Sequence, residues 1–167
     1  VTIPHKTNVL KYCDHLENEA MDTQSVNWIK IENKKLIGTN FDGIGFVNGL
    51  KNKNLIVENK DFAIFGIGGA GKSICYSLIR AKARRLKLIN RDANKLNLLV
   101  NKLKNLKSST EILIDDFRDY DISEYDYVIN ATSLGLKDNK DLIFDVQKTR
   151  TNCTIIDIVM DPEETIL

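Results

Sequence analysis

The sequence contains few of the residues that build metal centres or disulfide frameworks. It has two histidines and three cysteines in 167 residues. His5 and His15 do not have the spacing of a zinc motif. Cys13, Cys75 and Cys153 are far apart and form no CxxC motif, as is typical of reduced thiols in cytoplasmic proteins. We therefore expect no metal site and a cytoplasmic location.

The chain also lacks an excess of charge and any long apolar run. Its 24 Lys and Arg residues balance 23 Asp and Glu residues, which leaves a net charge of +1. This balance gives no general electrostatic reason to expect a nucleic acid or an anionic membrane as a partner. No apolar run approaches the length of a membrane span, and no signal peptide is visible. We expect neither partner, and any anion site must be local.

What the sequence does have is enough apolar material for a buried core. Hydrophobic residues make up 43% of the 167 positions, which suits one ordinary domain or two small lobes. The chain begins at Val1, without Met, in a segment that looks like a strand. We therefore expect it to be a piece of a longer protein.

The first third of the chain predicts short, mixed elements. Apolar residues spaced three and four apart predict an amphipathic helix over residues 7–20. Residues 26–38 predict a β-hairpin with a polar turn at its centre. Asp42 is expected at the N-cap of a short helix that runs to Leu50.

A polar run at residues 51–61 separates this pattern from a different one. Beyond it, strands and helices alternate, which predicts parallel βαβ units and an α/β fold with a Rossmann-type, doubly wound sheet. We place the boundary there, so that residues 1–55 form part of a smaller α/β lobe and residues 56–167 the Rossmann domain. The predicted strands are 62–66, 86–90, 111–114, 125–130 and 153–159, and the predicted helices are 74–81 and 95–106.

The segment 66–73, GIGGAGKS, fits two phosphate-binding patterns at once. As GxGxxG it indicates a dinucleotide fold, and as GxxxxGKS it indicates an NTPase P-loop. The NTPase interpretation needs Lys72 on the phosphates and an acid that holds magnesium, for which Asp157 is the candidate. The local sequence leaves both interpretations open.

The dinucleotide interpretation places the ribose contact about twenty residues beyond the glycines. Asn90 and Arg91 stand there, followed by Asp92 and Lys95. An arginine favours a 2′-phosphate, because its guanidinium can form charge-assisted bonds with it. Asp92 would oppose a neighbouring phosphate, although it is equally well placed to cap the next helix. NADP is therefore favoured as the cofactor, and NAD stays open.

Seven motifs, in the same order and at comparable spacing, resemble those of the shikimate dehydrogenase family. GTNFDGIGF at 38–46 is similar to the family's GxNTDGxGF, and INATSLG at 129–135 is similar to its INATPxGM. The other five are VTIPHK at 1–6, SVN at 25–27, GIGGAG at 66–71, INRDANK at 89–95 and DIVMDPEET at 157–165. Their common order carries the resemblance, because one short motif alone would be weak support.

The resemblance implies an NADPH-dependent enzyme that reversibly reduces 3-dehydroshikimate to shikimate in chorismate and aromatic amino acid biosynthesis. By position, Lys6 and Asp42 match the family's catalytic pair. Thr2, Asn27 and Met160 fall at its substrate contacts. The residues that match its cofactor site are Gly66, Ile67, Gly68, Gly69, Ala70, Asn90, Arg91, Lys95, Thr132 and Ile158.

The chemistry of such a reduction suits these residue types. Hydride delivery to a ketone builds negative charge on its oxygen, so the site needs a nearby cation or proton donor. Lys6 can serve, and an adjacent Asp42 would hold its ammonium charged, so that the two act as one coupled unit. Asn27 and Thr2 offer neutral hydrogen bonds that can orient a polyhydroxylated ring.

Several positions depart from the family's pattern. Phe41 and Trp28 stand in place of threonines near the expected substrate, and Met160 in place of a tyrosine. Lys95 stands where the family has an arginine, so a compact ammonium replaces a planar guanidinium that could bind a phosphate through two hydrogen bonds. These departures leave open an NAD(P)-dependent quinate/shikimate dehydrogenase and a catalytically weak NADP-binding paralogue, with the P-loop NTPase as a remote third.

The resemblance also implies that parts of the site lie outside this chain. The family's serine pair for the substrate carboxylate precedes the matching segment, and its closing helices follow it. We expect residues 1–167 alone to be inactive or nearly so, and the intact gene product to act on a small molecule. The sequence makes no prediction of the oligomeric state.

Overall fold

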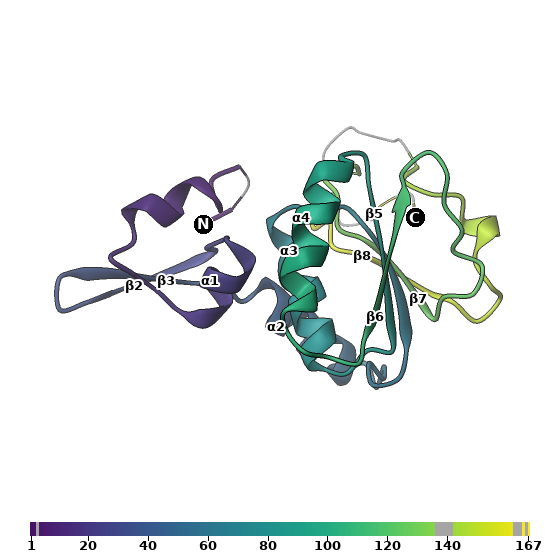
Figure 1. Ribbon diagram of the computed structural model, residues 1–167, viewed down its shortest axis with the longest axis horizontal. Helices are drawn as coiled ribbons and strands as arrows, with labels where there is room; N and C mark the ends of the chain where they lie inside the picture. Colours follow the sequence, from purple (N-terminus) through teal and green to yellow (C-terminus); the bar gives the residue numbers. More distant parts are fainter. Residues whose placement is uncertain (3, 136–141, 162–164, 166) are drawn as a thin grey trace.

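The chain forms a small three-stranded sheet and a larger five-stranded one, at opposite ends of the molecule in Figure 1. The computed structural model describes residues 1–2, 4–135, 142–161, 165 and 167. The small part contains the 3-10 helix η1 (Asn8–Tyr12), β1 (His15–Leu16), α1 (Asn18–Thr23), β2 (Trp28–Glu32) and β3 (Lys35–Thr39). The large part contains α2 (Asp42–Asn52), β4 (Asp61–Phe65), α3 (Gly69–Arg80), β5 (Arg85–Asn90), α4 (Ala93–Lys104), β6 (Glu111–Asp116), β7 (Tyr127–Asn130), η2 (Val146–Lys148) and β8 (Thr154–Asp157).

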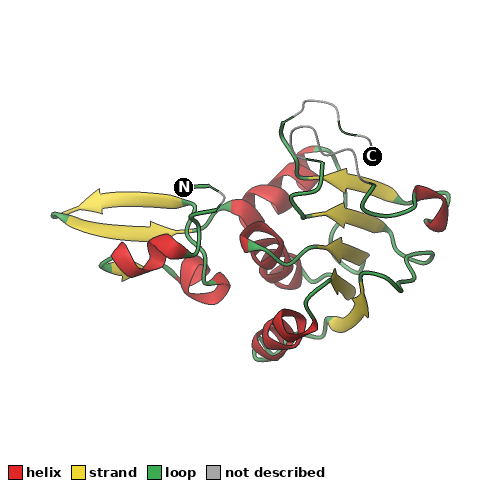
Figure 2. Ribbon diagram, turned by 90° about the horizontal axis from the view of Figure 1, so that it is seen from above, coloured by secondary structure: helices red, strands yellow, loops and turns green. Residues whose placement is uncertain are grey.

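The predicted hairpin is confirmed as β2 and β3, which pair antiparallel. Asn33 and Lys34 connect them, both with positive φ angles of 50° and 62°. Two central residues with φ above zero match the twist of a two-residue hairpin, and Asn tolerates this conformation better than most residues. Seen from above, the hairpin extends away from the large sheet (Figure 2).

The helix predicted over residues 7–20 is wrong, because β1 interrupts it. The backbone N–H of Asp14 donates to the carbonyl of Leu36, and the Asp14 carboxylate accepts from the Leu36 N–H. His15 and Leu16 then pair parallel with β3. Pairing with a strand distant in sequence therefore replaces one continuous helix by η1, β1 and α1, and the apolar spacing is shared among them.

The large sheet confirms the predicted Rossmann-type α/β architecture. Its strand order is β6-β5-β4-β7-β8, and all four pairings are parallel. The chain moves outward from β4 to one edge and then returns to the other side of β4, so the carboxyl end of β4 is the topological switch point at which such sheets bind ligands. Helices α2, α3 and α4 lie on the same side of this sheet in Figure 1. None of the helices in the described ranges is both long and apolar enough to cross a membrane.

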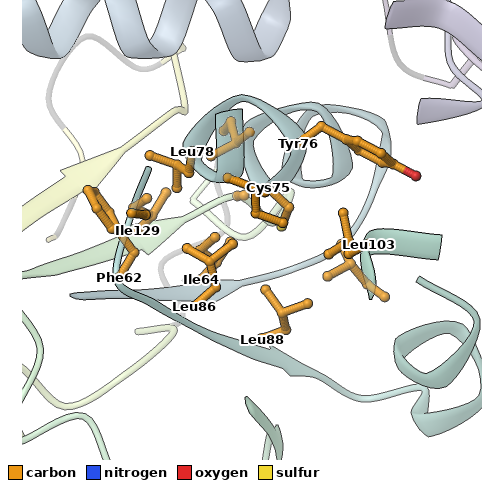
Figure 3. Packing of buried hydrophobic residues seen from close by; sticks show 14 of the residues in the cluster. Phe62, Ile64, Cys75, Tyr76, Leu78, Leu86, Leu88, Leu103 and Ile129 are labelled. Atoms are coloured by element: carbon orange, nitrogen blue, oxygen red, sulfur yellow. The ribbon is translucent and has the colours of Figure 1, made fainter. Parts of the chain in front are cut away.

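The core of the large part lies between the sheet and its helices. Figure 3 shows side chains from β4, β5 and β7 packed against Cys75 and Leu78 of α3 and Leu103 of α4. Alternate strand residues, such as Ala63 and Phe65, face a second cluster on the other side of the sheet. Because both faces are covered, β4 is buried at every residue, which explains why it reads as an uninterrupted apolar run.

Helix α2 begins close to the predicted position but packs with the large part. Asp42 is its first helical residue and Phe41 holds the N-cap position, one residue earlier than expected. Val47 and Leu50 join the core beneath α3. The division predicted at residue 55 stays a prediction, and this packing favours a division before α2.

Candidate active site

The glycine turn after β4 is shaped by two positions that exclude a side chain. Gly66 has φ +90°, and a Cβ there would lie 2.8 Å from Thr132 Cγ2 and 2.9 Å from the Ala131 carbonyl. A Cβ on Gly71 would lie 2.2 Å from the Gly66 carbonyl oxygen. These glycines let β4, β7 and the start of α3 approach one another, which is the requirement behind the GxGxxG spacing.

Gly68 behaves differently, because the space beside it is open. It occupies the N-cap of α3, and a Cβ built on it meets nothing within 4 Å. The N–H groups of the first turn of a helix have no intrahelical partners, and the helix dipole favours negative charge there. This end of α3 is therefore suited to a phosphate group.

A cavity of about 470 Å³ opens over the glycine turn. It includes residues from the carboxyl ends of β4, β5 and β7, and it also includes Pro4, Lys6 and Thr7 of the small part. Every residue predicted for the cofactor site lines it: Gly66, Ile67, Gly68, Gly69, Ala70, Asn90, Arg91, Lys95, Thr132 and Ile158. The structure thus brings the glycine turn, a basic strand end and an ammonium group to one cavity.

Lys6 and Asp42, the predicted catalytic pair, form an ion pair. The Lys6 Nζ lies 2.7 Å from Asp42 Oδ2, and the two side chains are only 15% and 19% exposed. Asn27 Nδ2 donates to the other oxygen, Oδ1, over 2.7 Å. A Cβ placed on Gly69 would lie 3.4 Å from Lys6 Cδ, so the lysine side chain runs directly past the glycine turn. Partial burial strengthens such a charged contact.

Asn40 connects this ion pair to α3, and sequence reasoning missed it. Its side chain is 2% exposed, and its Oδ1 accepts hydrogen bonds from the Asp42 N–H and the Ser73 hydroxyl. Its Nδ2 donates to the Ser25 carbonyl. An Asn two residues before a helical Asp is a signal for such capping of the helix start, but in GTNFDG it looks like an ordinary turn residue.

None of the three predicted substrate residues lines the cavity, and Asn27 instead bonds Asp42 beside it. Thr2 is exposed, and its carbonyl accepts from the His5 N–H. Met160 is 90% exposed. Trp28 and Phe41, which depart from the family's pattern, stack edge to face with ring centroids 5.7 Å apart. The roles assigned to these residues stay predictions.

Asp92 is occupied in capping α4. Its carboxylate accepts from the Lys95 N–H over 3.1 Å and lies 3.4 Å from the Lys95 Nζ. The backbone hydrogen bond from Lys95, followed by the contact with its ammonium, holds the pKa of Asp92 below its ordinary value. Asp92 does not line the cavity, whereas Arg91 does. The Asp92 carboxylate should therefore repel a 2′-phosphate beside Arg91 less than its position in the sequence suggests.

The geometry contradicts the P-loop interpretation. Lys72 does not line the cavity over the glycine turn but a separate one beside α4. The Ser73 hydroxyl is buried and donates to Asn40, and the Asp157 carboxylate accepts from Asn130 and from the Val159 N–H. Lys72 thus lies away from the proposed phosphate site, and Ser73 and Asp157 bond protein groups in place of a magnesium ion. Within the described ranges, no group of three or more His, Cys, Asp or Glu residues could hold a metal ion.

Sequence reasoning assigned no role to several lining residues, although Ser133 and Leu134 belong to the INATSLG motif. Phe117 follows β6, and Ser133 and Leu134 follow β7. Ligands of parallel α/β sheets bind beyond the carboxyl ends of the strands, so residues just after each predicted strand were candidates on topology alone. Thr7, beside Lys6, carried no comparable signal.

Comparison with known proteins identifies the family. The profile described as shikimate / quinate 5-dehydrogenase matches residues 50–162, which include the glycine turn and the parallel sheet. The chain belongs to this family. A shikimate dehydrogenase (NADP(+)) of Methanococcus maripaludis is 36% identical over 169 residues, covering 99% of this chain and 59% of the relative. One from Staphylococcus aureus is 34% identical, with the same two shares. The chain thus spans about three fifths of the length of these shikimate dehydrogenases.

Solved structures of similar proteins have the same fold. A shikimate dehydrogenase in complex with NADP⁺ superposes with a TM-score of 0.87 at 32% identity, covering 100% of this chain and 59% of that one. The quinate dehydrogenase of Corynebacterium glutamicum in complex with NAD gives 0.86 at 26% identity, with 99% and 60% covered. A 5-ketofructose reductase of Gluconobacter gives 0.82 at 30% identity, with 98% and 60% covered. The pairwise matches extend over the small part and so include Lys6 and Asp42, which the family profile does not reach.

Proposed function

We propose that the protein containing this chain is a shikimate dehydrogenase, which reversibly reduces 3-dehydroshikimate to shikimate with NADPH. The observation that carries the proposal is the ion pair between Lys6 and Asp42 at the edge of the glycine-turn cavity. Relatives named shikimate dehydrogenase (NADP(+)) support it. Since the chain spans 59% of these relatives, the proposal concerns the whole protein, which we place in the cytoplasm and expect to act on a small molecule.

The residues of the cavity fit a dinucleotide phosphate. The open space at Gly68 and the unpaired N–H groups of α3 suit the pyrophosphate. Arg91 and Lys95 line the same cavity and offer two positive charges to a 2′-phosphate. Asn90 lies beside them at the end of β5. A reduced nicotinamide, when bound, supplies the hydride.

The remaining steps belong to the chain's own side chains. The Lys6 ammonium, held by Asp42, stabilises the negative charge that develops on the ketone oxygen and donates a proton to it. In the oxidative direction the pair accepts the proton as a unit. Asn27 fixes the second carboxylate oxygen of Asp42 and so orients the pair, and Asn27, Thr2 and Met160 are our proposed substrate contacts.

Replacement of Lys6 tests the proposal. In the full-length protein, Lys6→Ala should lower the rate of NADP⁺-dependent shikimate oxidation by about a hundredfold or more, because general acid–base groups contribute at that scale. Lys11→Ala removes an equal charge from an exposed position and should leave the rate unchanged. The measurement is the absorbance of the reduced cofactor. A Lys6→Ala protein with the full rate would refute the catalytic pair.

A second candidate is an NAD(P)-dependent quinate/shikimate dehydrogenase. It is favoured by the likeness to the NAD complex of a quinate dehydrogenase. It is also favoured by the ion pair between Lys95 and Asp92, because that pair partly neutralises an ammonium that would otherwise bind the 2′-phosphate of NADP. Comparing kcat/KM for NADP⁺ and NAD⁺ with shikimate and quinate separates the two candidates. NADPH binding without turnover on either acid would instead indicate a catalytically weak paralogue.

A further inference from the structure

A second cavity, of about 280 Å³, lies between α1 of the small part and helices α3 and α4 of the large part. We call it the lysine cavity. Three of its lining residues are lysines, and two are leucines of α4. The residues that line it are Asp22, Thr23, Lys72, Lys95, Leu98, Leu99 and Lys102.

The three lysines bring like charges together in a partly enclosed space. Lys72 is half-buried, whereas Lys95 and Lys102 reach in from the exposed surface of α4. Burial lowers the pKa of Lys72, and the nearby charges of Lys102 and Lys95 lower it further. The charged form of Lys72 is thus disfavoured by its burial and by these two neighbours, and a bound anion would relieve that repulsion.

The surrounding carboxylates do not neutralise this charge. Asp22 accepts a hydrogen bond from Arg80 Nη2 over 2.6 Å, so it already has a cationic partner outside the cavity. Of the three lysines, only Lys95 has an ion-pair partner among the described residues, namely Asp92 at 3.4 Å. Lys72 and Lys102 therefore line the cavity without an ion-pair partner in the described part of the chain.

From this arrangement we propose that the lysine cavity binds a small phosphate-bearing metabolite. Three lysines that line one cavity match a group that carries two negative charges better than a single carboxylate. The volume is at the lower end of the range for small-molecule sites, which suits a compact ligand. Leu98, which is 65% exposed, and Leu99 offer an apolar wall for its carbon skeleton.

Lys95 connects this site to the active site, because it lines both cavities. An anion in the lysine cavity competes for the ammonium that the proposed function assigns to the 2′-phosphate. By linkage, the anion should weaken binding of NADP⁺, and NADP⁺ should weaken binding of the anion, with a smaller effect for NAD⁺. This coupling rests on the proposed cofactor, whereas binding of the anion itself does not.

Calorimetric titration of the full-length protein with inorganic phosphate, in a phosphate-free buffer of low ionic strength, tests the site. Lys72→Gln/Lys102→Gln should weaken phosphate binding about tenfold. Lys104→Gln/Lys107→Gln removes the same charge from exposed positions that do not line the cavity and should leave it unchanged. Thermal melting of each variant verifies that it is folded.

A third variant separates the two cavities. Arg91→Gln alters only the glycine-turn cavity, so phosphate binding at the lysine cavity should persist in it. If phosphate binding is lost in Arg91→Gln and unchanged in Lys72→Gln/Lys102→Gln, the anion binds at the cofactor site and the proposal is wrong. Absence of phosphate binding in the wild-type protein overturns it equally. Neither result bears on turnover of shikimate, which tests the proposed function separately.

Discussion

Gly66 and Gly68, two residues apart in one turn, should respond differently to an added methyl group. Gly66→Ala forces a side chain into φ +90° and against Thr132 and Ala131, so it should cost about 1–3 kcal/mol of folding free energy. Gly68→Ala meets open space and should change stability by less than about 0.5 kcal/mol. It should still weaken NADP⁺ binding, because its methyl group occupies the space proposed for the pyrophosphate. Urea unfolding and cofactor titration measure the two effects, and equal losses of stability would contradict the assignment.

Cys75 should make the stability of the chain depend on alkaline pH. Complete burial raises the pKa of its thiol to about 12, from an ordinary value of 9.0. Between these values the unfolded chain loses a proton that the folded chain keeps, so the free energy of unfolding falls as pH rises above about 9, by up to about 1.4 kcal/mol per pH unit. Below the ordinary value the contribution is fully present.

Cys75→Ala isolates this term. It removes the titrating group, so the stability difference between the wild type and the variant should shrink by about 2–3 kcal/mol when urea unfolding is repeated at about pH 11 instead of about pH 8. All other groups titrate in both proteins and cancel. A difference that stays constant with pH would show that the thiol ionises as readily in the folded chain as in the unfolded one.

At this scale, sequence reasoning brought together the residues to which the motifs assign a role, and it missed one to which they assign none. The contact between Lys6 and Asp42 and the lining by Arg91 and Lys95 were predicted from ordered motifs. Asn40 was missed because asparagine is common both in exposed turns and in buried hydrogen-bond networks. Only its hydrogen-bond partners, which the sequence does not reveal, distinguish these two roles.

Helix α2 contains three glycines with different surroundings. A Cβ on Gly43 would lie 2.0 Å from the Ser73 carbonyl oxygen and 2.4 Å from Ser77 Oγ, whereas Cβ atoms on Gly45 and Gly49 meet nothing within 4 Å. Gly43 therefore sets the close approach of α2 to α3. Such an approach fixes how far Asp42 stands from the glycine turn.

Alanine substitutions in α2 should accordingly have opposite signs. Gly43→Ala pushes α2 from α3 and should cost about 1–3 kcal/mol. Gly45→Ala, on the exposed face, should stabilise the protein by about 0.5–1 kcal/mol, because alanine loses less backbone entropy in a helix. Thermal unfolding of both variants measures the contrast. Destabilisation of similar size in both would argue against a tight crossing of the two helices.

Among the elements, the βαβ half was predictable and the first third was less so. The central strands β4 and β7 are buried at every residue, so their apolar runs read clearly between polar turns. In the small part, β1 consists of two residues held by a strand more than twenty positions away. The local spacing of apolar residues does not indicate such a long-range pairing. In residues 7–20 that spacing is the one typical of an amphipathic helix.

Polar contacts join the small and large parts, among them the bonds of Lys6 and Asn27 to Asp42. Asn40 bonds Ser73 of α3, and Arg80 of α3 bonds Glu19 and Asp22 of α1. The Arg80 pairs are exposed, and such pairs contribute little stability. Asn40 is only 2% exposed, so its network should contribute more to the connection between the two parts than the Arg80 pairs do.

Asn40→Ala tests this connection. The change leaves the Ser25 carbonyl, the Asp42 N–H and the Ser73 hydroxyl without this partner, and we expect a loss of about 2–4 kcal/mol. Amide hydrogen exchange should rise at the start of α2. Asn48→Ala, on the exposed side of the same helix, should leave both measurements unchanged. If Asn40→Ala behaves like Asn48→Ala, the network does not hold the two parts together.

Trp28 has a practical consequence for the whole molecule. It is the only tryptophan in the chain, and it is 44% exposed. It directly follows Asn27, which donates a hydrogen bond to Asp42. Indole emission responds to the polarity of its surroundings, and reduced nicotinamide absorbs light in the range where indole emits. The protein therefore carries its own fluorophore next to the proposed catalytic pair, and quenching of its emission can report cofactor binding without any attached dye.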